Sequence, residues 1–319
     1  MTLKKWIAGL LALTFLLTAG CALPGLGTST RSGIVVASGS YAERQIMSEM
    51  TAEMIRHYMP DVNVSVINNL GSATLVNQSL VRGDANVAGC MYTGTSLTGE
   101  LNMPPITDPK KAFKAVVDGY DQKFDCKWYD SFGFANTYAF MVTRDLAERE
   151  HLTKVSDLER LKDTLKVGVD THWLRREGDG YEAFQKIYGF SFKNMHSMEL
   201  GLVYGAVNAG EVDCVLGYST DGRINAFDLV LLEDDRHLFP PYDASPVATH
   251  AVLQKYPELD GVLRRMNGVI TSETMQKLNR RSDEDHVEPY TVAKDFLKEN
   301  NYFEDKGKEA AQWACCKIC

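Results

Sequence analysis

The sequence predicts an α/β fold built from two similar lobes, and two patterns indicate it. Early in the chain, short apolar runs alternate with amphipathic segments of helical period, in the order strand, helix, strand, helix, strand. Residues 202–218 (LVYGAVNAGEVDCVLGY) then resemble residues 75–92 (LVNQSLVRGDANVAGCMY), with a Leu-Val start, a glycine-acid turn and a strand that ends at a tyrosine. The length of 319 residues also favours two lobes over a single core.

The first series of elements begins with the apolar run at residues 34–37, which predicts a buried strand. Apolar side chains then recur at helical spacing from Ile46 to Tyr58 and predict a helix that Pro60 ends. The elements that follow are an alternating strand at residues 62–66, a helix from Ser72 to Gly83, and a strand at residues 87–92.

The second series consists of a strand at residues 165–169, a helix at residues 181–188 that stops at Gly189, and the helix-turn-strand segment at residues 202–218. The tail, residues 256–301, predicts three helices. Their starts lie near Pro257, Ser272 and Pro289, since proline and capping residues begin helices. We expect these three helices to pack on the first lobe.

Two extended segments, residues 134–142 and 245–253, are candidates for strands that cross between the lobes. They predict a discontinuous first lobe, residues 33–137 plus 247–319, and a second lobe, residues 138–246. Ligands of α/β sheets bind outside the carboxyl ends of the strands. A cleft between the two lobes is therefore the expected site.

The N-terminus predicts export. Residues 1–20 combine Lys4 and Lys5 with an apolar run and small residues, which is typical of a signal peptide. Cys21 follows directly and resembles the lipidated cysteine of a bacterial lipoprotein, with residues 21–32 as the tether. We expect the protein to be anchored on the outer face of the bacterial cytoplasmic membrane. Plain secretion, with Cys21 as an ordinary thiol, is the alternative.

The net charge and the sequence motifs exclude several classes of function. The formal net charge of −8 argues against nucleic acid and acidic lipid surfaces as partners. The sequence has no G-x-S-x-G, G-x-G-x-x-G, P-loop or H-E-x-x-H motif, and its seven histidines do not pair at metal spacing. We therefore expect no enzyme activity, no cofactor and no metal site. The single C-x-x-C, from Cys316 to Cys319, leaves a redox or zinc role open.

Four of the 14 tyrosines fall at strand ends or beside the crossings: Tyr92, Tyr138, Tyr218 and Tyr242. Ring faces attract cations that offer no hydrogen-bond donor, and a quaternary ammonium group is such a cation. The placement therefore predicts an aromatic cage for a methylated ammonium. For any one tyrosine alone, a role in the core or on the surface is the alternative.

Many solutes with a quaternary ammonium group also carry a carboxylate or a hydroxyl. Ser40, Thr95 and Asn136 are candidates to contact it, because they lie near the same strand ends. Ser40 and Glu43 have the spacing of a helix capping box, and the free N–H groups of such a helix form an anion site. Capping by Ser40 and a turn at Asn136 are the structural alternatives.

Six stretches, taken together, resemble the substrate-binding lipoproteins of bacterial osmoprotectant ABC transporters, which capture glycine betaine, carnitine, choline or related solutes. They are VASGSYAERQIMSEM, MYTGTSLTGEL, FGFANTYAFMV, LVYGAVNAGEVD, YSTDGRI and PPYDASPV, within residues 33–303. The resemblance implies a type II periplasmic-binding-protein fold, with two α/β lobes joined by two crossings.

The same resemblance implies a ligand cage at Tyr92, Tyr138, Tyr218 and Tyr242, with Thr95 and Asn136 near the carboxylate. It also implies delivery of the solute to a membrane permease after the lobes close. A protein of this fold that acts as an adhesin, a signalling module or an enzyme is the alternative.

Overall fold

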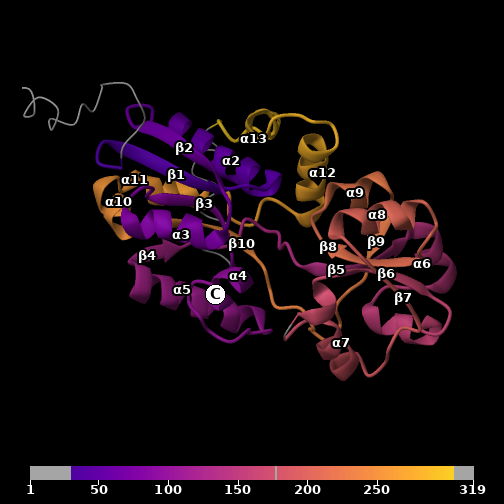
Figure 1. Cartoon of the computed structure of the whole chain (residues 1–319). Coiled ribbons are helices and arrows are strands. Elements are labelled where there is room, and N and C mark those ends of the chain that lie inside the picture. Colours follow the sequence, from indigo (N-terminus) through magenta and orange to yellow (C-terminus); the bar gives the residue numbers. More distant parts are fainter. Residues whose placement is uncertain (1–29, 177, 305–319) are drawn as a thin grey trace, which may run out of the picture.

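The computed structural model describes residues 30–176 and 178–304. The predicted signal peptide, residues 1–20, lies outside these residues, as do Cys21 with most of the tether and the tail cysteines Cys315, Cys316 and Cys319. Two five-stranded sheets form the centres of two lobes (Figure 1). The predicted α/β class and the two-lobe organisation are confirmed.

The first sheet has the strand order β2-β1-β3-β10-β4. Its strands are β1 (Gly33–Gly39), β2 (Asn63–Leu70), β3 (Val87–Tyr92), β4 (Cys126–Trp128) and β10 (Ala244–Thr249). β1 runs parallel to β2 and β3, whereas β10 runs antiparallel to β3 and β4. Strand β10 arrives from the second lobe, which explains its opposite direction.

Helices cover both faces of the first sheet. They are α2 (Ala42–Tyr58), α3 (Ala73–Arg82), α4 (Thr93–Thr98), α5 (Pro109–Phe124), α10 (His250–Lys255), α11 (Glu258–Arg264), α12 (Ser272–Asp283) and α13 (Pro289–Glu299). Along β1 the side chains alternate: Ile34 and Val36 join the core under α2, and Val35 and Ala37 join the core under α3 and α5. A strand that is buried on both faces has a continuous run of apolar residues in its sequence.

The second sheet has the order β7-β6-β8-β5-β9. Its strands are β5 (Tyr138–Thr143), β6 (Lys166–Asp170), β7 (Asn194–Met198), β8 (Cys214–Tyr218) and β9 (Leu229–Leu231). Its helices are α6 (Arg144–Glu150), η1 (Val155–Leu161), η2 (Trp173–Arg175), α7 (Tyr181–Tyr188), α8 (Leu200–Asn208) and α9 (Gly222–Ala226). Aromatic side chains, among them Phe140, Trp173 and Phe184, fill one side of this sheet.

The chain passes between the sheets twice, as predicted, but both crossings lie earlier in the sequence than predicted. The segments expected to cross, residues 134–142 and 245–253, mostly belong to β5 and β10. Their apolar side chains are buried against neighbouring strands of each sheet. The crossings are the segments before them, residues 129–137 and 232–243.

The two crossings lie side by side. Ala135 and Asp243 form an antiparallel bridge, and the Asn136 N–H donates to the Tyr242 carbonyl at 3.1 Å. Strand β10 begins at Ala244, whereas the sequence predicted the return to the first lobe at residue 247. The exact lobe boundaries stay a prediction from the sequence.

The three C-terminal helices start where the sequence predicted them, and α11 and α13 pack on α2 of the first lobe. Helix α12 also packs on α9 of the second lobe (Figure 1). The Gln276 and Asn279 side chains of α12 donate to the carbonyls of Ser219 at 2.8 Å and Thr220 at 2.7 Å. The prediction that these helices pack on the first lobe is therefore incomplete, because α12 joins both lobes.

Gly222, the first residue of α9, permits this contact. A Cβ atom at Gly222 would lie 2.6 Å from the Cα and N atoms of Arg280 in α12. Only a glycine lets the two backbones approach so closely.

A charged cluster joins β4 to α11 in the first lobe. Asp260 accepts hydrogen bonds from Lys127, from the Tyr129 hydroxyl at 2.9 Å and from Arg264 at 2.9 Å. Burial alone would raise the pKa of Asp260, but these hydrogen bonds lower it to about 2.

Candidate functional site

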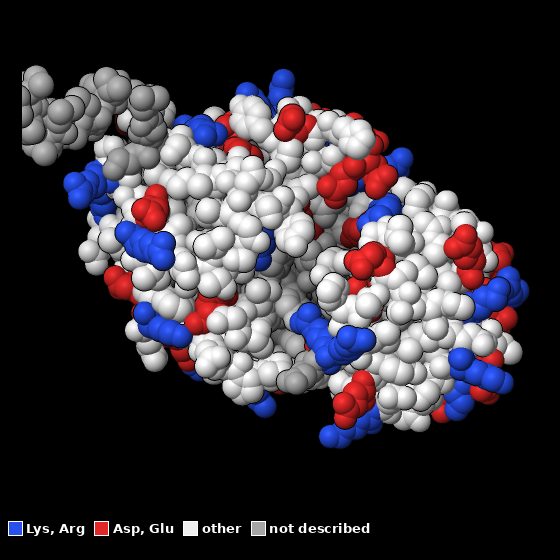
Figure 2. All heavy atoms as spheres, in the orientation of Figure 1, with Lys and Arg blue, Asp and Glu red and all other residues white. Residues whose placement is uncertain are grey.

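A cavity of about 550 Å³ opens between the two lobes. Figure 2 shows the groove that runs between them on the molecular surface. All seven residues that the sequence singled out for solute contact line this cavity: Ser40, Tyr92, Thr95, Asn136, Tyr138, Tyr218 and Tyr242. Their roles in binding stay predictions at this point, but the structure brings them together.

Strand pairing places two of the tyrosines. Strands β5 and β8 are antiparallel, and their register puts Tyr138 directly opposite Tyr218. The two ring centroids lie 5.1 Å apart with an interplanar angle of 36°. Side chains directly opposite on one face of a sheet are in contact, so the pair forms one wall from two strand ends.

The segment after β3 places Tyr242. The Thr93 hydroxyl donates to the Pro241 carbonyl at 2.8 Å and accepts from the Asp243 N–H at 3.0 Å, which fixes the second crossing on both sides of Tyr242. A Cβ atom at Gly94 would lie 2.8 Å from the Tyr242 ring. The Thr-Gly pair after Tyr92 therefore holds the ring and leaves room for it.

Polar partners hold the phenol hydroxyls of Tyr92 and Tyr138. The Tyr92 hydroxyl donates to Glu43 at 2.5 Å, and the Tyr138 hydroxyl donates to Asp170 at 2.7 Å. With their hydroxyl ends fixed, these rings have their faces as the remaining binding surface.

Arg176 holds Tyr242. Its guanidinium donates to the Tyr242 hydroxyl at 2.5 Å and to Asp179 at 2.5 Å. It also lies over the Tyr138 ring, 5.6 Å from the centroid. Arg176 lines the cavity, so it brings a positive charge next to the rings.

The four rings are uncharged. Burial raises the pKa of the phenols of Tyr92, Tyr138, Tyr218 and Tyr242 above the ordinary value for tyrosine. The phenols therefore stay protonated at neutral pH, and any attraction for a cation comes from the ring faces.

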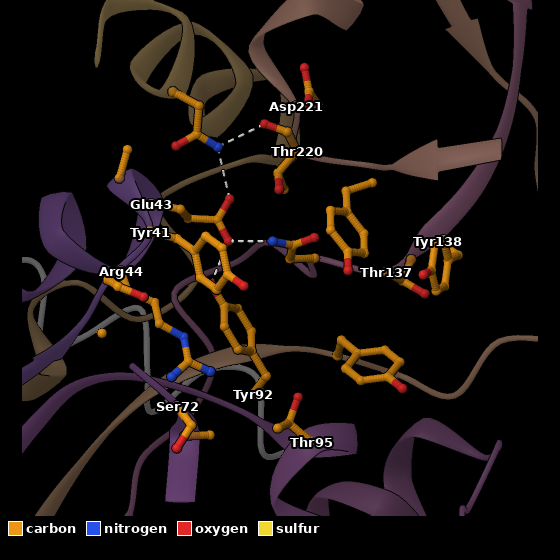
Figure 3. Close-up of a pocket in the computed structure, with 18 of the residues that line it drawn as sticks. Tyr41, Glu43, Arg44, Ser72, Tyr92, Thr95, Thr137, Tyr138, Thr220 and Asp221 are labelled. Atoms are coloured by element: carbon orange, nitrogen blue, oxygen red, sulfur yellow. Dashed lines mark hydrogen bonds between the residues drawn. The ribbon is translucent and has the colours of Figure 1, made fainter. Parts of the chain in front are cut away.

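Glu43 connects three segments at one side of the cavity. Besides the Tyr92 hydroxyl, it accepts hydrogen bonds from Asn136 Nδ2 at 2.8 Å and Asn279 Nδ2 at 2.9 Å. The side chain is buried, with 5% of the residue exposed. Figure 3 shows Glu43 directed toward Tyr92 inside the cavity.

The predicted capping box at Ser40 and Glu43 is wrong. The N-cap residue of α2 is Tyr41, and the Glu43 carboxylate contacts distant segments instead of its own helix. Ser40 is exposed, precedes the helix and lines the cavity.

Thr95 and Asn136 differ in what they offer a ligand. Thr95 is half-buried in the first turn of α4 and lines the cavity. Asn136 already donates to Glu43, and its Oδ1 is buried without a hydrogen-bond partner among the described residues. The atom left over on Asn136 is thus an acceptor, which suits a hydroxyl donor.

Sequence reasoning missed several cavity residues, above all Arg44 and Arg176. Arg176 follows the short turn η2, which carries no periodic pattern. For Arg44, a signal existed: it is a charged residue inside a helix that is otherwise buried on most sides. Such charges need a partner or a ligand.

Two negative findings apply to residues 30–176 and 178–304. Within them, no helix is both long enough and apolar enough to cross a bilayer. Within the same residues, no group of three or more His, Cys, Asp and Glu side chains could hold a metal ion.

The cavity lies between two α/β lobes joined by two crossings, and aromatic rings from separate segments line it. This combination defines a two-lobed solute-binding protein. Residues 32–299 match the OpuAC family, the substrate binding domain of the ABC-type glycine betaine transport system. The chain belongs to this family, as the sequence motifs predicted.

Similar proteins agree with this assignment. The carnitine transport binding protein OpuCC of Listeria monocytogenes is 45% identical over 306 residues, which cover 95% of this chain and 99% of that protein. A glycine-betaine-binding protein of Pseudomonas aeruginosa is 30% identical over 294 residues, covering 88% of this chain and 91% of that protein.

A solved structure described as a glycine betaine/carnitine/choline ABC transporter has a TM-score of 0.83 at 47% identity. The match covers 85% of this chain and 100% of that one. The expected type II periplasmic-binding-protein fold is confirmed. The family also confirms that this chain is a transport binding protein and not an enzyme.

Proposed function

We propose that this protein is the extracytoplasmic receptor of an osmoprotectant ABC transporter. It binds a quaternary-ammonium solute such as glycine betaine, carnitine or choline in a cage of Tyr92, Tyr138, Tyr218 and Tyr242, and it passes the solute to a membrane permease. The observation that carries this proposal is that four tyrosines from separate segments line a single cavity.

The energetics suit such a cage. A cation over a tyrosine ring gains about 0.5–1 kcal/mol at an exposed site and about 2 kcal/mol when both are desolvated. Four such contacts, reduced by the cost of ordering the solute and the lobes, are enough for micromolar affinity, which is about −8 kcal/mol. Neutral phenols do not attract metal ions or lysine as a carboxylate would, so the cage favours a methylated ammonium.

The other end of the solute has suitable partners nearby. The Arg176 guanidinium lies over the Tyr138 ring and offers a positive charge to a carboxylate. Thr95 offers a hydroxyl, and Asn136 Oδ1 offers an acceptor to a solute hydroxyl. This donor and acceptor set suits a solute that carries a carboxylate, a hydroxyl or both.

Closure of the two lobes around the solute would present a docking surface to the permease. Lipidation at Cys21 belongs to the same proposal, since an anchor holds the receptor near its permease. Cys21 lies outside the described residues, so its lipidation is tested separately by mass spectrometry of the membrane-bound protein.

The cage is tested by calorimetric titration of glycine betaine, carnitine and choline. Tyr138→Ala, Tyr218→Ala and Tyr242→Ala should each weaken binding by about tenfold or more, since each removes one desolvated ring face. Tyr92→Ala should do the same, and it also removes a hydrogen bond to Glu43.

The matched control is Tyr290→Ala, an exposed tyrosine on α13 that does not line the cavity. It should bind as the wild type does. Wild-type affinity in all four cage variants would rule out the cage. A wild type that binds none of the three solutes would favour the adhesin or signalling alternative.

A further inference from the structure

We propose that Arg44 and the N-terminal turn of α3 form an anion subsite, separated from the cation cage by the Tyr92 ring. This subsite takes the carboxylate of an extended zwitterionic solute. The inference rests on the proposed function and deepens it, because it names which solutes of the class the cavity selects.

Arg44 is a buried residue whose guanidinium faces the cavity. Only 7% of the residue is exposed, and it lines the cavity. Among the residues that the structure describes, its guanidinium forms no hydrogen bond and no ion pair, and it lies over the Tyr92 ring, 4.8 Å from the centroid. A guanidinium has five N–H donors, so Arg44 can offer hydrogen bonds to an anion in the cavity.

The backbone is arranged to accommodate Arg44 in this position. A Cβ atom at Gly39 would lie 2.5 Å from Arg44 Cδ, so the stem of the arginine lies where any other residue at position 39 would put its side chain. The Ser38 hydroxyl donates to the Arg44 carbonyl at 3.2 Å and ties the first turn of α2 to β1. The stem of Arg44 therefore packs beside β1 at the cavity wall.

The α3 helix begins at the same wall. Residues 70–73 line the cavity, and Ser72 is the N-cap residue of this ten-residue helix. The Ser72 hydroxyl accepts from the Leu75 N–H at 3.2 Å, which leaves the N–H groups of Ala73 and Thr74 at the open end. The first turn of α3 contains no acidic side chain. A helix start of this kind favours an anion.

Figure 3 shows how these parts are arranged. Arg44 points toward Ser72, and both lie on one side of Tyr92, whereas Tyr138 lies on the other side. One face of the Tyr92 ring therefore contacts a protein cation, and the rest of the cage lies beyond the ring. A solute that occupies both the cation cage and the anion subsite needs a carboxylate that is well separated from its ammonium group.

The two arginines then serve solutes of different length. Arg176 lies beside the Tyr138 ring and suits a short zwitterion such as glycine betaine. Arg44 suits a longer one such as carnitine. Choline has no anionic end, so it gains nothing from Arg44. The guanidinium on the Tyr92 ring even opposes a second cation on that ring.

The first experiment is calorimetric titration of Arg44→Gln with carnitine and with choline. We expect the Kd for carnitine to rise about tenfold or more, because a charge-assisted contact is lost. The Kd for choline should stay unchanged or fall. Arg56→Gln is the matched control: it removes an arginine from the same helix outside the cavity, and it should leave carnitine binding unchanged.

A second variant keeps every arginine. Ser72→Asp preserves a good N-cap residue and places a carboxylate beside Arg44, where it competes with the solute. It should weaken carnitine binding about as much as Arg44→Gln does and leave choline binding intact. This variant still tests the subsite if Arg44→Gln fails to fold, because Ser72 is an exposed residue.

Unchanged carnitine affinity in both variants overturns the subsite. An equal loss of carnitine and choline binding also overturns it, because that result means only a structural role. If the wild type binds no quaternary-ammonium solute, the proposed function itself fails, and this outcome is distinct from the other two.

Discussion

Glu43→Gln tests the idea that one buried carboxylate holds the cavity wall together. Glu43 accepts from the Tyr92 hydroxyl and Asn136 on Oε1, and from Asn279 on Oε2. A glutamine has one oxygen and one NH₂ group. Whichever way it turns, its NH₂ group faces at least one of these donors.

The substitution therefore loses at least one hydrogen bond to a charged acceptor, which contributes about 1.5–3 kcal/mol. The remaining hydrogen bonds have a neutral amide as their acceptor and are weaker than those to a carboxylate. Relief of carboxylate desolvation offsets part of the loss, so we expect a net decrease of about 2 kcal/mol in the free energy of unfolding. Solute affinity should also fall, because Asn136 lies in the first crossing.

Urea unfolding monitored by circular dichroism measures the change, and calorimetry measures solute affinity. Glu49→Gln is the matched control, since Glu49 is a buried glutamate of the same helix that accepts one hydrogen bond within the described part of the chain, from Asn68 at 3.2 Å. It should cost about 1 kcal/mol or less. Equal stability of the Glu43→Gln and wild-type proteins would refute the reasoning.

Two further substitutions test the contact between the lobes and the charged cluster of the first lobe. Gly222→Ala should destabilise the contact between α9 and α12 by about 1–3 kcal/mol in the same urea assay, because its Cβ would meet the Arg280 backbone. The control is Gly205→Ala in α8, whose Cβ meets no described atom within 4 Å, and it should be neutral or stabilising. Asp260→Asn tests pH dependence. The folded pKa is lowered from 3.8 to about 2, so Asp260 stabilises the fold above about pH 4 and loses this effect as the pH falls toward 2. The variant should show a shallower fall in unfolding midpoint over that range, and an unchanged slope would contradict the assignment.

Local signals allowed much of the fold to be predicted. The helix from residue 72 to Gly83 is bounded as expected, because Ser72 caps it and Gly83 adopts a left-handed conformation with φ of 77°. Gly189 ends α7 in the same way. The strand predicted at residues 87–92 coincides with β3, and its last residue, Tyr92, lines the cavity.

Long-range contacts explain what the sequence could not show. Glu43 has the spacing of a capping residue, yet its partners Tyr92, Asn136 and Asn279 lie 49, 93 and 236 residues away. No local pattern distinguishes that role from capping. The apolar runs of β5 and β10 likewise look the same whether they cross between lobes or lie within a sheet.

Helix α12 constrains any movement of one lobe relative to the other, because it contacts both. It touches α2 on one side and, through Gln276 and Asn279, the loop after β8 on the other. Any rotation about the two crossings must either carry α12 along or slide it past α9. Apparent affinity scales with the fraction of molecules in the binding-competent state. Substitution of an α12 residue outside the cavity lining, such as Gln276, is therefore expected to change solute affinity.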